Sequence, residues 1–216
     1  MNPARDDFET EVRNLIYPIH RPLPILSQLA LQKTSQAIEL LGMEGSPITQ
    51  QTYPKLHADM FLASLHAGLL TQDLGDWKIT NKTDRLHIHH SGLNVDIRVL
   101  KSWKEGAPPA GRNRARQDDW MQPELAYSTN IETALNGMTF LLLWCLSGER
   151  VDFMLTHPSD AGQFPECSAT DFIMRLGVED YMDRRFAKTR EEDFYIPNTN
   201  LVLPKTNAEL TGKDRR

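Results

Sequence analysis

The segment that most constrains the fold of this chain runs from Leu86 to Lys101 and reads LHIHHSGLNVDIRVLK. Apolar and polar residues alternate on both sides of Ser91-Gly92, which predicts two half-buried strands joined by a tight turn. One face of this hairpin carries apolar residues, namely Leu86, Ile88, Leu93, Val95, Ile97 and Val99. The opposite face carries His87, His89, Asn94, Asp96 and Arg98. We therefore expect one face to pack on a core and the other to be polar.

Upstream of this hairpin the chain reads as helical. Apolar residues three and four positions apart predict helices over residues 5–17, 25–41 and 53–69, with a turn region at 42–51. A short strand is expected at Trp77–Thr80, just before the hairpin.

Downstream, the uninterrupted apolar run Phe140–Leu146 predicts a strand buried on both faces, with Val151–His157 as its hairpin partner. A short helix is expected near residues 130–136, and the sequence Ser168–Asp171 is typical of another helix start. Further helix is predicted at 178–193, followed by an edge strand in the LVLP sequence.

Segregated helices and antiparallel strands predict an α+β fold. In this interpretation a helical N-terminal part is followed by an antiparallel sheet built from two hairpins, and helices follow at the C-terminus. The predicted organisation is a helical region at 1–75, an α+β region at 76–204 with an exposed basic connector at 104–117, and a mobile tail at 205–216.

The sequence LHAGLLTQDLGDWKIT, residues 65–80, resembles the way in which winged-helix domains leave their last helix and enter a hairpin wing. This resemblance implies a winged-helix-like arrangement of the N-terminal helices and the hairpin. DNA binding does not follow from it, because helix 53–69 has only Lys55 as a firm positive charge and also contains Asp59.

Composition narrows the class of protein. Of the 216 residues, 40% are hydrophobic and 25% charged, which is typical of a folded domain. The net charge of -5 argues against a protein that coats nucleic acid over its whole surface. Two cysteines give no disulfide framework, the N-terminus has no apolar signal region, and Phe140–Leu146 is too short to span a bilayer. We therefore expect a cytoplasmic protein that does not act in a membrane.

The strongest candidate binding site is basic. Six cations follow one another with Glu105 as the single acid between them, and Trp103 and Trp120 flank the cluster. Exposed cations contact phosphates and aromatic rings stack on unpaired bases, so this segment predicts contact with nucleic acid. Surface ion pairing with Asp118 and Asp119 is the alternative. The cations are Arg98, Lys101, Lys104, Arg112, Arg114 and Arg116.

The polar face of the hairpin is a weaker candidate. A two-residue turn at Ser91-Gly92 would set Asp96 opposite His87 and Asn94 opposite His89. His87, His89 and Asp96 would then be a possible metal set for a hydrolase, or Asp96 and Glu105 with Lys101 or Lys104 for a nuclease. The alternative is the solvated face of a sheet.

We expect no metal at the hairpin, because Arg98 on the same face would repel a cation. No cofactor is expected either, since the sequence contains no CxxC pair, HExxH motif, serine elbow or glycine-rich phosphate loop.

We therefore predict a protein that binds a macromolecule and does not catalyse a reaction. Its partner is either nucleic acid, through residues 98–116, or another protein. The alternatives are a metal-dependent hydrolase or nuclease centred on the 86–101 hairpin and a structural subunit of a complex. The sequence leaves the oligomeric state open.

Overall fold

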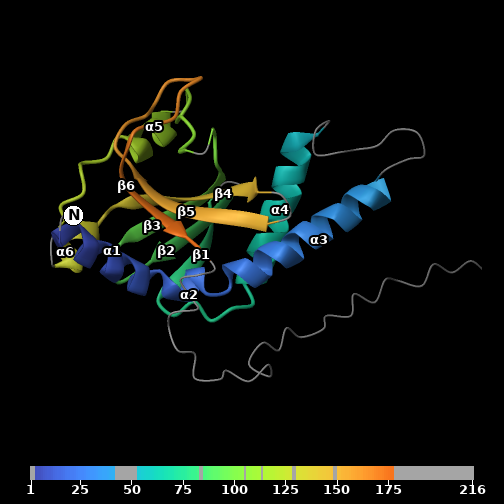
Figure 1. Ribbon diagram of the computed structural model, residues 1–216, viewed down its shortest axis with the longest axis horizontal. Helices are drawn as coiled ribbons and strands as arrows, with labels where there is room; N and C mark the ends of the chain where they lie inside the picture. The colour runs from blue at the N-terminus through green and yellow to red at the C-terminus, as the bar shows by residue number, and fades with distance from the viewer. Residues whose placement is uncertain are drawn as a thin grey trace, which may run out of the picture. The chain divides into compact units, whose positions relative to one another are not determined.

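The structure is a computed structural model that describes residues 3–41, 53–82, 85–104, 106–112, 114–127, 130–147 and 150–177. Contacts divide the chain into two units, Met1–Arg184 and Arg185–Arg216, and the second unit lies outside the described residues. Figure 1 shows the elements of the first unit, a mixed α+β fold with one six-stranded sheet. The helices are α1 (Pro3–Leu15), α2 (Tyr17–His20), α3 (Leu23–Leu41), α4 (Pro54–Leu69), α5 (Arg114–Trp120) and α6 (Ile131–Leu135). The strands are β1 (Trp77–Lys82), β2 (Arg85–His90), β3 (Val95–Lys101), β4 (Thr139–Ser147), β5 (Arg150–Pro158) and β6 (Thr170–Leu176).

The strands lie in the sheet in the order in which they occur in the chain. Strands β1, β2 and β3 form one antiparallel meander and β4, β5 and β6 form another. The two meanders meet through the parallel pair β3 and β4. The prediction of an antiparallel sheet made of two hairpins is therefore correct only in part. Parallel neighbours need a long crossover, and residues 102–138 supply it.

Strand β4 is the centre of the core, as predicted for Phe140–Leu146. Every residue from Phe140 to Trp144 is at most 2% exposed. Successive side chains of a strand point to opposite faces, so Phe140, Leu142 and Trp144 enter one apolar cluster while Leu141 and Leu143 enter another. The alternating hairpin residues Ile88, Val95, Ile97 and Val99 belong to the first cluster.

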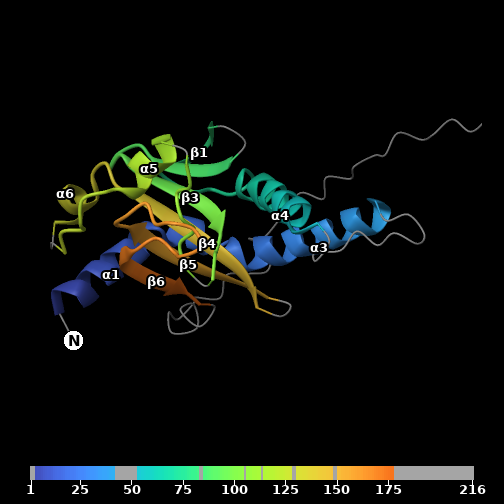
Figure 2. The same ribbon diagram turned by 90° about the horizontal axis from the view of Figure 1, so that it is seen from above.

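Helices α1 to α4 cover the first of these faces (Figures 1 and 2). Phe8 of α1, Leu26 of α3 and Phe61 of α4 are buried in this cluster, and the Phe61 ring lies 4.3 Å from the Trp144 ring. Helices α3 and α4 approach closely at Gly68, where an added Cβ would lie 2.9 Å from Leu26 Cδ2. A glycine therefore allows this close packing of the two helices.

The opposite face is covered by α5 and by the chain that leads into it. Trp120 is fully buried against Leu141 and Leu143, together with Ala107 and Ala110. The sequence predicted an exposed connector at 104–117 and no helix there. Helix α5 is short and largely polar, and its order comes from the packing of Trp120 at its last position.

One predicted helix is wrong, and several other predicted segments lie outside the described residues. The segment after Ser168 is not a helix but strand β6, where Phe172, Met174 and Leu176 are buried and alternate with exposed residues. The turn at 42–51, the helix at 178–193, the LVLP strand and the tail at 205–216 are outside the described residues.

The winged-helix-like arrangement is not confirmed, because the hairpin at 86–101 is continuous with the six-stranded sheet. Within the part of the chain that the structure describes, no helix has the length and apolar character needed to cross a membrane.

Candidate functional site

The basic residues of the predicted nucleic-acid site do not form one patch. Arg98 Nη2 makes an ion pair with Asp119 Oδ2, and the Arg98 side chain is only 18% exposed. The Arg98 and Arg116 guanidinium carbons lie 5.7 and 5.2 Å from the centre of the buried Trp120 ring. Arg98 of β3 therefore helps to hold α5 on the sheet, whereas the Arg116 contact lies within α5 itself.

Asp119 shows that this environment is partly desolvated. Burial raises the pKa of the Asp119 carboxyl, and the neighbouring Asp96 and Asp118 raise it further. The ion pair and hydrogen bond with Arg98 act in the opposite direction but do not compensate. The pair is a contact between α5 and β3 at the edge of the second cluster, and it leaves Arg98 occupied.

Lys101 lies on the other side of the sheet from Arg98. Its Nζ is 5.7 Å from the centre of the Trp144 ring, on the face that α4 covers. Burial lowers the pKa of His57 on α4, and the positive charge of Lys101 lowers it further. Alternation along β3 places Lys101, which is exposed, and Arg98 on opposite faces of the sheet, so the two cations do not share one flat patch.

The remaining cations, Lys104, Arg112 and Arg114, are exposed. Among the described residues none of the three has an ion pair. Exposed acids lie on the same side of the sheet, namely Asp118 on α5 and Asp160 and Glu166 on the loop before β6. The exposed charge of this region is therefore mixed.

The hairpin register differs from the predicted one. Residues 91–94 form a four-residue turn in which Asn94 has φ +52° and His90 Nδ1 accepts a hydrogen bond from the Leu93 N–H at 3.1 Å. Asp96 consequently pairs with His89, and Arg98 pairs with His87. The prediction that Asp96 faces His87 is wrong by two residues, a shift that leaves every side chain on its predicted face.

His89 and Asp96 form a polar pair, with His89 Nδ1 3.1 Å from Asp96 Oδ1. His87 is 6% exposed and stands opposite Arg98. Across the described ranges the structure contains no group of three histidine, cysteine or acidic side chains that could hold a metal ion. Glu105, the other residue of the nuclease hypothesis, is outside the described residues.

A second histidine–carboxylate pair lies inside the protein. His157 Nδ1 is 2.7 Å from Asp171 Oδ1, and the histidine side chain is 0% exposed. Burial lowers the pKa of His157, although the hydrogen bond and charge of Asp171 act to raise it. Asp171 also accepts a hydrogen bond from the Leu125 N–H at 2.8 Å. This arrangement ties the backbone at Leu125 to the sheet, and its histidine is closed to solvent while the Asp171 side chain is 17% exposed, so we interpret it as structural.

Two exposed aromatic residues, Trp103 and Phe164, lie side by side. The sequence analysis named Trp103 only as a neighbour of the basic residues, and no sequence pattern indicated that Phe164 would be its partner. The two ring centres are 5.6 Å apart, and the residues are 38% and 70% exposed. Trp103 Nε1 donates to the Pro165 carbonyl at 3.0 Å, and Cys167 Sγ donates to the Trp103 carbonyl at 3.1 Å. We call these two rings the Trp103–Phe164 pair.

The loops that carry this pair are joined by backbone hydrogen bonds. The Ala110 N–H donates to the Ala161 carbonyl at 2.7 Å, and the Ser168 N–H donates to the Ala107 carbonyl at 3.0 Å. Residues 102–110 and 159–169, far apart in sequence, thus form one layer on the face of the sheet that α5 also covers.

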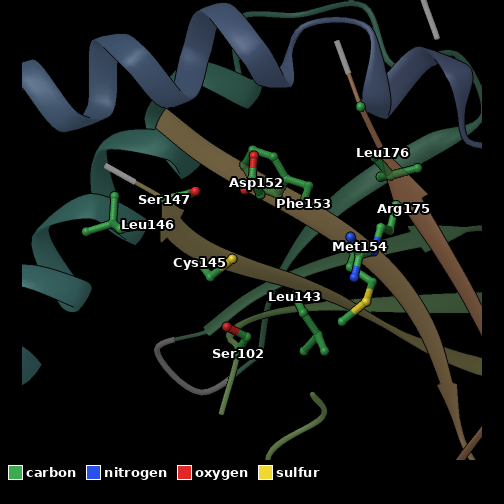
Figure 3. Close-up of a pocket in the computed structure, with 11 residues that line it drawn as sticks. Ser102, Leu143, Cys145, Leu146, Ser147, Asp152, Phe153, Met154, Arg175 and Leu176 are labelled. Atoms are coloured by element: carbon green, nitrogen blue, oxygen red, sulfur yellow. The ribbon is translucent and has the colours of Figure 1, made fainter. Parts of the chain in front are cut away.

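Beside this layer, β4, β5 and β6 border a cavity of about 440 Å³ that is open to solvent on one side. Figure 3 shows its lining side chains, and we call it the β4–β6 cavity. Ser102, the residue before Trp103, lines it, so the cavity borders the loop that carries Trp103, while neither ring of the Trp103–Phe164 pair belongs to its lining. The lining residues used below are Ser102, Leu143, Cys145, Asp152, Met154 and Arg175.

No family model, no curated protein and no solved structure has detectable similarity to this chain.

Proposed function

We propose that this protein binds another protein, through a docking surface formed by the Trp103–Phe164 pair and the adjoining β4–β6 cavity. The observation that carries the proposal is the exposure of two large aromatic rings side by side on hydrogen-bonded loops. Tryptophan and other aromatic residues are enriched among the residues that dominate binding energy at protein interfaces.

The fixed conformation of the Trp103 ring strengthens this interpretation. Trp103 is held by its own Nε1 donor and by the Cys167 thiol on its carbonyl. Trp103 therefore loses little side-chain freedom when a partner covers it, and burial of its apolar area favours binding with a small entropic cost.

The geometry supports a protein partner better than nucleic acid. Arg98 is paired with Asp119, Lys101 lies on the helix-covered face, and Arg116 packs on Trp120. Lys101, Lys104, Arg112 and Arg114 are exposed, but Lys101 lies apart from the other three, which share their side of the sheet with three exposed acids. Nucleic-acid affinity depends on several neutralised phosphates, and a mixed surface gives few of them. Cysteine content favours a reducing compartment, and a cytoplasmic location stays a prediction.

Selection of random peptides displayed on phage against the purified full chain tests this function. Enriched peptides should bind the parent protein and lose at least about tenfold in affinity to Trp103→Ala and to Phe164→Ala. Phe164 is 70% exposed, so its replacement leaves the core intact. The matched control is Met121→Ala, a 66% exposed residue at the end of α5, which should bind like the parent.

Three results would overturn the proposal: no enriched peptide, equal binding by all three variants, or binding of single-stranded oligonucleotides that falls steeply with salt. In the last case the affected residues should be Arg112 and Arg114, and the nucleic-acid alternative would replace the protein partner.

A further inference from the structure

We infer that the β4–β6 cavity binds the free carboxyl terminus of a partner polypeptide whose last side chain is apolar. This inference rests on the proposed protein-binding function and names the part of the partner that the surface takes. The juxtaposition that points to it is an arginine without an ion pair to any described residue, at the end of an apolar row of side chains.

The strand register builds this row. Leu143 of β4 pairs with Met154 of β5, and Met154 pairs with Arg175 of β6, so the three side chains stand in line across the sheet. All three line the cavity, and in Figure 3 the Arg175 and Met154 side chains lie together. Leu143 is 1% exposed, which makes the base of the row apolar.

Arg175 is available to a ligand. Among the described residues it has neither an ion pair nor a hydrogen bond from its guanidinium group to a side chain. A guanidinium group binds a carboxylate with two parallel hydrogen bonds, and an apolar floor strengthens such a bond by excluding water. The charge at this end of the row thus complements a single carboxylate.

The next row of the same face gives the ligand a direction. Cys145 pairs with Asp152, and both line the cavity. Asp152 is two residues from Met154 on β5, a separation of about 7 Å along a strand. A carboxylate on Arg175 therefore avoids Asp152, while Asp152 can accept a backbone N–H from the residues that precede that carboxylate.

A polypeptide end satisfies these groups together. Its terminal carboxylate meets Arg175, its last apolar side chain rests on the partly buried Met154, and an upstream N–H donates to Asp152. The cavity is open on one side and adjoins Ser102, so the preceding residues would leave it toward Trp103 and Phe164. A small carboxylic acid would fill the row but would leave Asp152 and the two rings unused.

Protection of Cys145 from iodoacetamide measures occupancy directly, because this thiol lines the cavity. We would use the full chain with Cys167→Ser, which keeps a hydroxyl donor near the Trp103 carbonyl and leaves Cys145 as the single thiol. The probe is a pool of short acetylated peptides with randomised positions followed by a final leucine, made once as free acids and once as amides.

The free acids should protect Cys145 with a Kd at least about tenfold below that of the amides. Arg175→Gln should abolish the difference. Lys78→Gln, which removes one exposed positive charge from β1 at the other edge of the sheet, should preserve it.

Outcomes that overturn the inference differ from those that overturn the proposed function. Equal binding of acids and amides, with dependence on Phe164, would reject the carboxyl-terminus site and leave the protein-binding function standing. Protection by 4-methylpentanoate as strong as by the peptides would assign the cavity to a small acid. If neither peptide pool protects Cys145 and neither shows binding that depends on Phe164, both proposals are rejected.

Discussion

Replacing Trp120 with alanine should cost about 4 kcal/mol of the free energy of unfolding. Trp120 is 0% exposed, and a buried aromatic side chain removes about 150–250 Å² from water. At about 25 cal/mol per Å² the burial contributes about 4–6 kcal/mol, of which the alanine methyl group retains a small part. The lost hydrogen bond from Nε1 to the Pro108 carbonyl, 2.9 Å long, adds about 1 kcal/mol.

Relaxation of the neighbouring side chains offsets part of this loss, and measured tryptophan-to-alanine changes in cores are about 3–5 kcal/mol. Urea unfolding followed by circular dichroism gives the free energy directly, with the slope against denaturant as a check on the unfolded state. Trp120→Phe keeps a ring in the second cluster and should lose about 1–2 kcal/mol, from the smaller side chain and the lost Nε1 hydrogen bond. Met121→Ala, at the exposed neighbouring residue, should change stability by less than about 0.5 kcal/mol.

A loss below about 1 kcal/mol in Trp120→Ala would refute this reasoning. It would mean that α5 does not pack on the face of the sheet that carries Leu141 and Leu143. The contacts of the Arg98 and Arg116 guanidinium groups with the Trp120 ring would then also be absent.

Two further perturbations test the core. Leu142→Asp places a carboxylate without a partner in the centre of the sheet and should destabilise the protein by several kcal/mol. The control Ile173→Asp, at a 47% exposed site on β6, should cost about 1 kcal/mol. Similar urea midpoints for the two variants would contradict the placement of β4. Because burial lowers the pKa of His157, the unfolded chain binds its proton more readily, and the free energy of unfolding should fall as pH drops below about 6.5. His157→Asn keeps a donor toward Asp171 but cannot titrate, so this fall should become smaller, with a residual part from His57; an unchanged dependence on pH in urea titrations would exclude His157 as its source.

Local patterns predicted those parts of the fold whose burial follows from neighbours in sequence. Alternation over 86–101 fixed which hairpin residues enter the core, and Ile88 and Ile97 are accordingly buried. The apolar run beginning at Phe140 predicted a strand buried on both faces. The helices that became α1, α3 and α4 also followed from their spacing of apolar residues.

Predictions of the site were less complete, because a row of cations in sequence is not a row in space. Side chains of a strand alternate between its two faces, so Arg98 and Lys101, three residues apart on β3, lie on opposite faces. This separation could have been predicted from the sequence. The partner of Arg98, Asp119, is on α5, a helix without its own apolar stripe. Phe164 and Arg175 carried no motif, and they gained a candidate role only from their neighbours in the folded chain.

By itself, the sequence determined the type and the apolar face of the segments with a clear period, namely α1, α3, α4, the 86–101 hairpin and β4, because those properties repeat every two or every three to four residues. Only the tertiary structure decided that β3 lies parallel to β4, that Asp96 faces His89, and that α5 closes the second cluster. The first and the last depend on contacts between residues far apart in the chain, and the register of Asp96 depends on the conformation of the 91–94 turn; none of these leaves a periodic trace in the sequence. The Trp103–Phe164 pair and the β4–β6 cavity are of this kind, since two loops and three strands must come together before either exists.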